Sequence, residues 1–427
     1  MDKEETSRSR IRLFIYVVLG LLPLLLIPHG RASRLPLEAI EYYTNYPTDD
    51  ISVRVPVYVY CEDLEMPDLA AAVQIQVDHQ MNRTRDQRIW QWTLDIRDGK
   101  PEHFNEYYSL KVRIGAEDAI HVDNSLKYAE LFVKMESIAN NDVPFFVTQT
   151  LLFHIFHEEV EQQYLDHYTK TYDSNTGQFY IELDRDETVV EYGSDVKVLF
   201  TLFASEDLSG WELSYAISEY FEPLCLMISR LVNMTVESQV IYLDSLNYTL
   251  EAIKAQTSQL DADQTINLAI YPMPQRNIQQ IVSGSNSSTF LIPQWGAIYL
   301  YPLEQVGSDK TIRWNHLEFP MEEFTSRLFQ MLGLVKHPKS PQLRFEITQR
   351  LRILSNVLKM SQNLLSVEKL SKKGKLNEAL VKNVFECLRF RNETVASLNS
   401  QDWDSALSLS NLALERSNRA FFDENLL

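Results

Sequence analysis

Hydrophobic and polar positions alternate along the central part of the chain and follow a helical period in its last quarter. From Ile51 to Tyr60 the alternation is strict and predicts a half-buried strand, which Pro56 places near a sheet edge. Further strand-like runs are Tyr128–Lys134, Gln178–Leu183, Val196–Phe203, Gln239–Leu243, Leu268–Tyr271, Phe290–Ile292 and Ala297–Tyr301. Because helical patterns separate these runs, we predict a mixed α/β domain, a mixed sheet covered by helices.

Two helices are expected inside this domain. The segment Phe145–His167 follows the start signal Pro144. The segment Glu212–Leu231 carries one apolar stripe, which Pro223 should kink or interrupt.

Beyond Leu317 the strand pattern ends and apolar residues recur at helical spacing. One face is formed by Ile347, Leu351, Leu354 and Leu358, and another by Trp403, Ala406, Leu407, Ser410, Ala413 and Leu414. No 34-residue period accompanies them, so a tetratricopeptide array is not indicated. A C-terminal all-α bundle is therefore predicted for residues 318–427.

An unbroken apolar run, Leu13–Ile27, precedes every N-glycosylation sequon of the chain. The acceptors are Asn82, Asn233, Asn247, Asn286 and Asn392. This combination is typical of a membrane-targeted protein whose body lies in the lumen or outside the cell.

The run is slightly shorter than the roughly 20 residues that cross a bilayer untilted, so a cleaved signal peptide is the alternative. The best cleavage site, Gly30-Arg31-Ala32, is poor, and we favour an uncleaved N-terminal transmembrane helix. More basic residues precede the run than follow it, which predicts a cytosolic N-terminus. The expected organisation is a cytosolic tail (1–12), a signal anchor (13–28), a lumenal mixed α/β domain (40–317) and a lumenal helical region (318–427).

Composition narrows the range of partners. The net charge of −19 argues against a nucleic-acid-binding face, which needs clustered Lys and Arg. Cys61, Cys225 and Cys387 are too few for a disulfide framework, and their odd number leaves at least one unpaired within the chain. Cys225 and Cys387 lie in apolar runs and are expected to be small buried hydrophobes.

Candidate chemistry is sparse. His154, His157 and Glu158 have a spacing that allows metal chelation on a helix, although a solvated helix end explains them better. The pairs Asp184/Asp186 and Asp261/Asp263 have the Asp-x-Asp spacing with which a metal-dependent glycosyltransferase holds its ion. No Gly-x-Ser-x-Gly elbow, phosphate loop or dinucleotide fingerprint is present. We therefore assign no catalytic, cofactor-binding or metal-binding residue.

Four segments resemble one family. The C-terminal Ala420-Phe421-Phe422-Asp423 with Leu426-Leu427 resembles the Ala-Phe-Phe-Asp-x-x-Leu-Leu stretch of the PIG-S family, non-catalytic subunits of the GPI transamidase of the endoplasmic reticulum. Similar runs, in the same order along the chain, are Arg31–Pro36, Asn141–Val147, and a central group comprising Tyr220–Leu224, Asn233–Tyr242 and Pro293–Ile298.

The resemblance implies a lumenal scaffold subunit of the endoplasmic-reticulum membrane, needed for attaching preassembled GPI anchors to proproteins. It implies no cofactor. Its expected partners are the other transamidase subunits, including a caspase-like cysteine protease that supplies the catalytic Cys and His, and membrane lipid. GPI and the proprotein are further candidate partners, through indirect contact, and the sequence leaves open whether either touches this chain.

The resemblance also implies a second apolar span after Phe422, which we expect to be missing from the sequence ending at Leu427. A membrane-anchored lumenal enzyme, such as a glycosyltransferase, and a secreted binding protein remain the alternative hypotheses.

Overall fold

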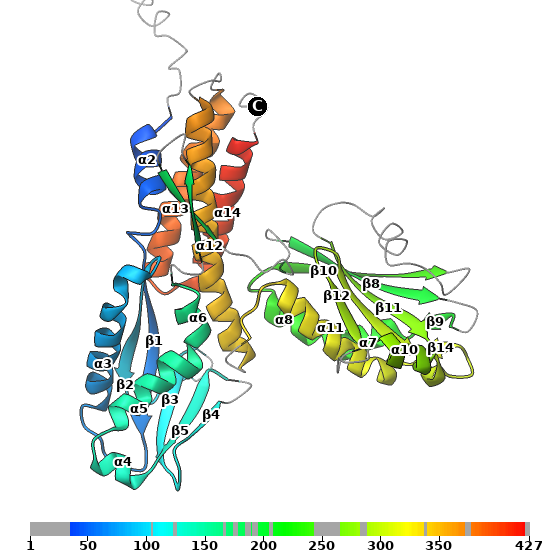
Figure 1. The fold of residues 1–427 in the computed structure, drawn as a ribbon, viewed down its shortest axis with the longest axis horizontal. Coiled ribbons are helices and arrows are strands. Elements are labelled where there is room, and N and C mark those ends of the chain that lie inside the picture. Colours follow the sequence, from blue (N-terminus) through cyan, green and yellow to red (C-terminus); the bar gives the residue numbers. More distant parts are fainter. Residues whose placement is uncertain are drawn as a thin grey trace, which may run out of the picture.

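The computed structural model describes residues 35–103, 106–122, 126–164, 168–173, 178–183, 189, 195–204, 208–242, 265–281, 288–336, 340–371 and 377–422. Figure 1 shows two sheets with their helices and a helical bundle that stands at one end of the first sheet. None of the described helices is long and apolar enough to cross a membrane, and the predicted span 13–28 lies outside the described ranges.

The first sheet has the strand order β2-β1-β3-β5-β4. Its strands are β1 (Ser52–Cys61), β2 (Gln91–Asp98), β3 (Tyr108–Ile114), β4 (Ala119–Val122) and β5 (Tyr128–Val133), all parallel except β4. Helices α3 (Leu69–Arg83) and α5 (Val143–Thr150) cover one face, where the alternate valines of β1 are buried. The half-buried strand predicted from Ile51 to Tyr60 is confirmed.

The prediction that Pro56 places this strand near a sheet edge agrees with the strand order, because β1 is the second strand of the sheet, between the edge strand β2 and β3. The register explains why proline is tolerated. Pairing of β1 with β3 begins at Val57, so the part of β1 that ends at Pro56 has a strand neighbour on one side only. A missing amide hydrogen therefore costs the sheet little at this residue.

The prediction of a single helix from Phe145 to His167 is wrong, because the structure divides this segment. Helix α5 passes into a π-helical turn, η2 (Leu151–Ile155), and a short helix α6 (His157–Glu161) follows. Phe156, between η2 and α6, is fully buried, with its ring centroid 5.9 Å from that of Trp92 and 5.4 Å from that of Tyr108. The change in winding accompanies the insertion of this ring into the core.

The second sheet repeats the topology of the first. Its order is β10-β8-β11-β13-β12, and its strands are β8 (Asp195–Ala204), β10 (Asn233–Tyr242), β11 (Thr265–Met273), β12 (Thr289–Ile292) and β13 (Gly296–Pro302). Only the fifth position, β12, is antiparallel, as β4 is in the first sheet. Two mixed sheets therefore replace the one that we predicted.

Helices cover both faces of the second sheet. On one face Phe200 packs against Phe221 and Phe324, with ring centroids 5.1 and 6.1 Å away, from the segment before α8 (Glu222–Ile228) and from α11 (Glu318–Met331). On the other face Ile278 of α10 (Gln275–Ile281) joins a separate apolar cluster. The interruption expected at Pro223 is confirmed, since α7 (Leu213–Ala216) and a π-helical turn, η4 (Ile217–Phe221), precede α8.

Gly296 opens β13 at a point of close backbone approach. A Cβ atom there would lie 1.8 Å from the carbonyl oxygen of Asn267 on β11. No other residue fits without moving one of these two strands.

Smaller elements connect the large ones. The hairpin β6 (Tyr168–Asp173) and β7 (Gln178–Leu183) confirms the predicted strand Gln178–Leu183. A short parallel pair and single helical turns complete the described structure: β9 (Gly210–Trp211), β14 (Thr311–Ile312), α4 (Met135–Ala139), η1 (Arg85–Gln87), η5 (Leu303–Gln305) and η6 (Trp314–Leu317).

The C-terminal helices are α12 (Pro341–Ser371), α13 (Glu378–Asn399) and α14 (Trp403–Phe421), and α2 (Leu37–Asn45) packs against α12. Helix α12 has 31 residues and is therefore about 46 Å long. Its upper part lies in the bundle, and its lower part lies beside α6 and the end of α8 (Figure 1). The C-terminal helices that the sequence predicted are confirmed.

Polar side chains join α12 to α14 at intervals of seven residues. The Nδ2 of Asn356 donates to the Oδ1 of Asn411 at 2.7 Å, and the Nδ2 of Asn363 donates to the Oδ1 of Asn418 at 2.6 Å. One heptad earlier, the Nε2 of Gln349 donates to Asp404 at 2.7 Å. We call these three pairs the amide ladder, and they align the two helices at a repeat of seven residues.

The buried core around α12 yields a stability prediction. Ile347 is 0% exposed, so Ile347→Ala should lower the free energy of unfolding by about 2 to 5 kcal/mol through lost burial and a residual cavity. Ile75 on α3 is 70% exposed, and Ile75→Ala should change it by less than about 0.5 kcal/mol. Denaturant unfolding of the purified chain in detergent would compare them, and equal effects would contradict the packing described.

Candidate functional site at the α12 joint

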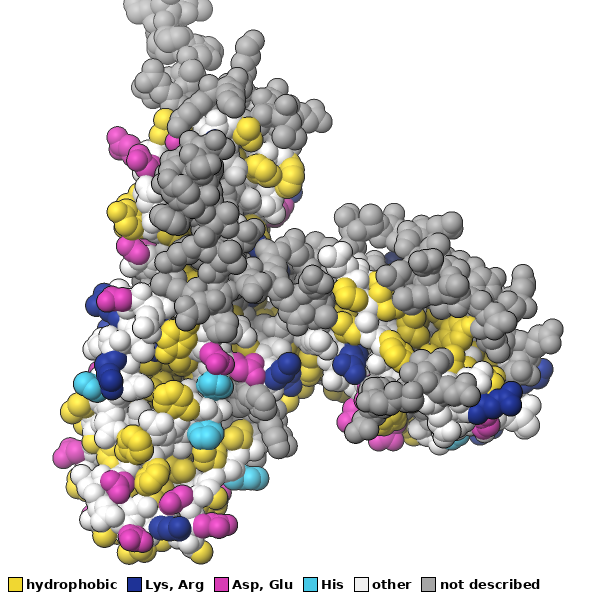
Figure 2. Space-filling view, viewed as in Figure 1, with side chains coloured by type: hydrophobic (Ala, Val, Ile, Leu, Met, Phe, Trp, Pro, Cys, Tyr) yellow, Lys and Arg dark blue, Asp and Glu magenta, His cyan; other side chains and the backbone are white. Residues whose placement is uncertain are grey.

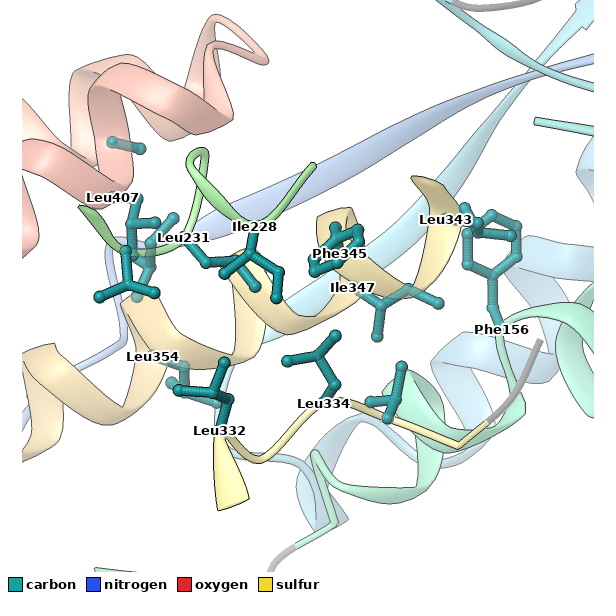
Figure 3. Packing of buried hydrophobic residues seen from close by; sticks show 14 of the residues in the cluster. Phe156, Ile228, Leu231, Leu332, Leu334, Leu343, Phe345, Ile347, Leu354 and Leu407 are labelled. Carbon is teal, nitrogen blue, oxygen red and sulfur yellow. The ribbon is translucent and has the colours of Figure 1, made fainter. Parts of the chain in front are cut away.

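The lower half of α12 lies where the two sheets and the bundle meet, and we call this region the α12 joint. Figure 3 shows apolar side chains from several distant segments converging here. Ile228 and Leu231 come from α8 and the residues after it, Phe156 lies between η2 and α6, Leu407 comes from α14, and Leu332 and Leu334 come from the segment before α12. One continuous core therefore joins elements that the sequence places far apart.

A fully buried ion pair crosses the joint. The Nε and second terminal nitrogen of Arg350 on α12 donate to the two carboxylate oxygens of Glu159 on α6, at 2.6 and 2.7 Å, and both side chains are 0% exposed. The indole nitrogen of Trp92 on β2 donates to the same carboxylate at 2.8 Å. Strand β2, α6 and α12 are thereby tied together.

The charge of Arg350 is kept in spite of its burial. Desolvation lowers the pKa of its guanidinium, but the adjacent Glu159 carboxylate more than offsets this, so the pKa is raised overall. The Trp403 ring of α14 lies 5.3 Å from the guanidinium carbon and adds a cation–π contact.

Further polar contacts fasten the start of α12 to the first sheet. Lys127, 5% exposed, forms an ion pair with Glu346 of α12 and donates to the carbonyl oxygen of Glu106 at 2.9 Å. The hydroxyl of Ser340 donates to the carbonyl oxygen of Leu126 at 2.8 Å. These contacts surround the Arg350–Glu159 pair and restrict the direction in which α12 leaves the sheet.

A second buried arginine ties the bundle to the chain entering β1. Arg391 on α13 is 0% exposed and makes two hydrogen bonds to the Asp50 carboxylate, at 2.5 and 2.6 Å. It also donates to the carbonyl oxygen of Pro47 at 3.0 Å, and its guanidinium lies 3.8 Å from the centroid of the Tyr43 ring. Two buried arginines, Arg350 and Arg391, therefore attach the C-terminal helices to the part of the chain that forms the first sheet.

Parallel sheets commonly bind ligands at the carboxyl ends of the two strands between which the strand order reverses, and in the first sheet these strands are β1 and β3. Exposed ion pairs lie at this position. Glu62, just after β1, forms ion pairs with Lys111 of β3 and with Lys100, whose Nζ lies 3.3 Å from the carboxylate. Both lysines lower the pKa of the Glu62 carboxyl. Asp63 accepts a hydrogen bond from the amide of Ile114 at 3.1 Å.

In the second sheet a shallow pocket of about 550 Å³ lies beyond the carboxyl end of β13, a feature that the sequence did not predict. Its lining includes Glu304, His316, Glu318 and Glu322 with Phe319. Glu304 is already occupied, since both its carboxylate oxygens accept from the amide of Gln275 at 3.0 Å.

The residues proposed for metal binding are not brought together. His154 is exposed, His157 lies 3.2 Å from Glu161, and Glu158 accepts from the amide of Lys336 at 2.7 Å. Figure 2 shows histidine side chains lying apart from one another over the first sheet's helices. Within the described ranges no group of three or more His, Cys, Asp or Glu residues is arranged for a metal ion. Asp184, Asp186, Asp261 and Asp263 lie outside these ranges.

All three cysteines are described, and none forms a disulfide bond. Burial raises the pKa of the Cys387 thiol to about 12, although Arg391 opposes the shift. Burial and the nearby Glu222 carboxylate raise the pKa of the Cys225 thiol. Both thiols are therefore held in the neutral, weakly nucleophilic form.

Three of the five predicted glycosylation acceptors lie in described segments, and each is exposed. Asn82 is near the end of α3, Asn233 begins β10, and Asn392 lies on α13. Asn233 donates to Asp195 at 2.9 Å and Asn392 accepts from the Tyr43 hydroxyl at 2.9 Å. Asn247 and Asn286 fall outside the described residues.

One feature of the sequence could have indicated a buried ion pair at the joint. Arg350 falls between Ile347 and Leu354 on the apolar face of α12, where a charged residue needs a buried partner. Nothing local identified that partner, because Glu159 is 191 residues away.

Known proteins resemble the chain across this whole arrangement. The family described as "PIG-S: Phosphatidylinositol-glycan biosynthesis class S protein" matches residues 13–427. The chain belongs to the PIG-S family. A relative in Saccharomyces cerevisiae, named GPI transamidase component GPI17, is 27% identical over 93% of this chain and 80% of its own length. The GPI transamidase component PIG-S homolog of Schizosaccharomyces pombe is 24% identical over 58% of this chain and 50% of its own.

In this PIG-S family member, removal of one partner of the buried pair should be costly. Arg350→Met leaves the Glu159 carboxylate buried without its cation and should lower the free energy of unfolding by about 3 to 5 kcal/mol. Trp92 and Trp403 flank the pair, so tryptophan fluorescence during denaturation is a direct measurement.

The control is Arg419→Met on α14, because Arg419 and its partner Glu415 are 57% and 46% exposed; its effect should be below about 1 kcal/mol. The double variant R350M/E159M should be more stable than R350M alone. A stable R350M protein would show that the pair does not hold the joint.

Proposed function

We propose that this chain is a component of the GPI transamidase and serves the attachment of preassembled GPI anchors to the C-termini of proproteins. The observation that carries the proposal is the family match over residues 13–427, together with the likeness to the yeast transamidase component over 93% of the chain. Both extend across the two sheets, the joint and the bundle.

We further propose that its role in the complex is to hold other subunits in place. The α12 joint supports this, because the buried Arg350 fixes α12 to the first sheet's helices and the buried Arg391 of α13 fixes the bundle to the chain entering β1. Together they give the two α/β parts and the bundle a defined relation. Such a body can present several separate surfaces to neighbouring subunits at once. A caspase-like subunit would provide the Cys and His of the reaction.

The proposed topology has residues 1–12 in the cytosol, a membrane span at 13–28, and lumenal parts 40–317 and 318–427 in the endoplasmic reticulum. The exposure of Asn82, Asn233 and Asn392 supports a lumenal body, since glycosylation acceptors lie on surfaces. In Figure 1, α2 and the end of α14 lie at the same end of the bundle. A span before α2 would therefore put the bundle next to the membrane and the first sheet farther away.

Complex membership can be tested by purification. A tagged full chain solubilised from microsomes in mild detergent should recover the caspase-like cysteine protease and the other transamidase subunits in comparable amounts. The readout is quantitative mass spectrometry, and an unrelated tagged protein with a lumenal body is the control. Recovery of the chain alone would contradict the proposal and return attention to the Asp-x-Asp glycosyltransferase hypothesis.

The proposed non-catalytic role predicts that no thiol of this chain is required for anchor attachment. Cells whose only copy is C61A/C225A/C387A should display GPI-anchored proteins at levels within about twofold of wild type, because the chain would not form the covalent intermediate. Flow cytometry of a GPI-anchored reporter measures this, with variant abundance checked by immunoblot. Loss of display at normal abundance would refute the non-catalytic assignment.

A further inference from the structure

The shared topology of the two sheets gives each an equivalent edge strand. Strand β2 borders the first sheet and β10 borders the second, and each pairs with the central strand that precedes it in the chain, β1 or β8. The outer edges of these two strands differ in how many of their backbone groups are hydrogen-bonded.

The edge of β2 is closed by side chains. The Gln74 amide of α3 donates to the carbonyl oxygen of Leu94 at 3.1 Å and accepts from the amide of Ile96 at 2.7 Å. Arg88 donates to the carbonyl oxygen of Trp92 at 3.4 Å. Gln74 thus supplies the donor and the acceptor that a neighbouring strand would supply, which blocks further pairing.

The edge of β10 has no such closure in the part of the chain that the structure describes. Its ten residues pair with β8, and no other described group is hydrogen-bonded to its backbone. No side chain of β10 is buried, whereas Trp92 and Leu94 of β2 are. At the end of β10, Val240 is 38% and Tyr242 is 70% exposed.

We propose that β10 is a docking edge at which an extended segment of a neighbouring protein subunit adds a strand to the second sheet. The inference rests on the proposed function, in which this chain is one subunit of a larger complex. A row of alternating amide and carbonyl groups about 33 Å long is complementary to another β-strand.

The side chains of β10 define the chemistry of that segment. One face of the strand carries Met234, Val236, Ser238, Val240 and Tyr242, and the other carries Asn233, Thr235, Glu237, Gln239 and Ile241. Met234 and Val236 pack against the core shared with α8. The added strand therefore carries apolar residues on the face that continues this core and mainly polar residues on the other face, where Ile241 is the one apolar side chain of β10 and packs against the separate cluster around Ile278.

Hydrogen exchange tests the proposal directly. The amide exchange of β10 is compared between the purified full chain and the purified transamidase assembly, with β2 as the internal reference. We expect the outward amides of β10 to exchange at least about tenfold more slowly in the assembly, and β2 to be unchanged.

Protection of the whole of β10 already in the isolated monomeric chain would overturn the proposal, because another segment of the chain would then cover the edge. Protection in the isolated chain that disappears on dilution would indicate a second copy and would also overturn it. Unchanged exchange in an assembly that contains the other subunits would refute the docking edge alone, whereas failure to recover those subunits would refute the proposed function.

A pair of matched variants adds a second readout. Val240→Lys should reduce recovery of the docked subunit about tenfold, since a lysine on the edge opposes strand addition. Gln91→Lys places the same charge on the exposed start of β2 and should leave recovery unchanged. Equal recovery with both variants, each with an unaltered melting temperature, would overturn the proposal.

Discussion

The buried contact between Arg350 and Glu159 is the constraint on which the arrangement of the molecule depends. Both side chains are completely withdrawn from solvent, so each charge is tolerated only because the other is present. The pair fixes the azimuth of α12 against the first sheet, and α12 in turn carries the bundle and contacts the end of α8. An apolar replacement could stabilise this region equally well, but it would not specify one orientation so narrowly.

Much of the secondary structure could be predicted from local pattern. Strands β1, β5, β8, β11 and β13 are rich in buried apolar residues, and their runs are found in the sequence within a few residues of their bounds. Strands β2 and β3 were missed although Trp92 and Leu94, or Leu110 and Val112, alternate in the same way. Their alternate positions carry charged or polar side chains, such as Asp95 and Arg97 in β2 and Lys111 and Arg113 in β3, which lowers the apolar content of both runs.

The repeated topology and the joint could not be predicted, because both depend on long-range pairing. The two units share a strand order but fill their cores with different residues, so no common sequence motif reveals the repeat. Glu159 is separated from Arg350 by 191 residues, and only the folded chain shows why each is tolerated in an apolar setting.

The amide ladder has a consequence for how the helices find their positions. Its pairs recur every seven residues and have similar chemistry, so sliding α14 along α12 by one heptad would leave two of the three pairs matched, Gln349 with Asn411 and Asn356 with Asn418. The ladder alone therefore does not distinguish the native alignment from one shifted by a heptad. The contact between the Trp403 ring and the Arg350 guanidinium does, because it forms in the native alignment. The alignment of α14 along α12 therefore depends on the joint as well as on the ladder, while Arg391 and Asp50 hold the bundle to the chain entering β1.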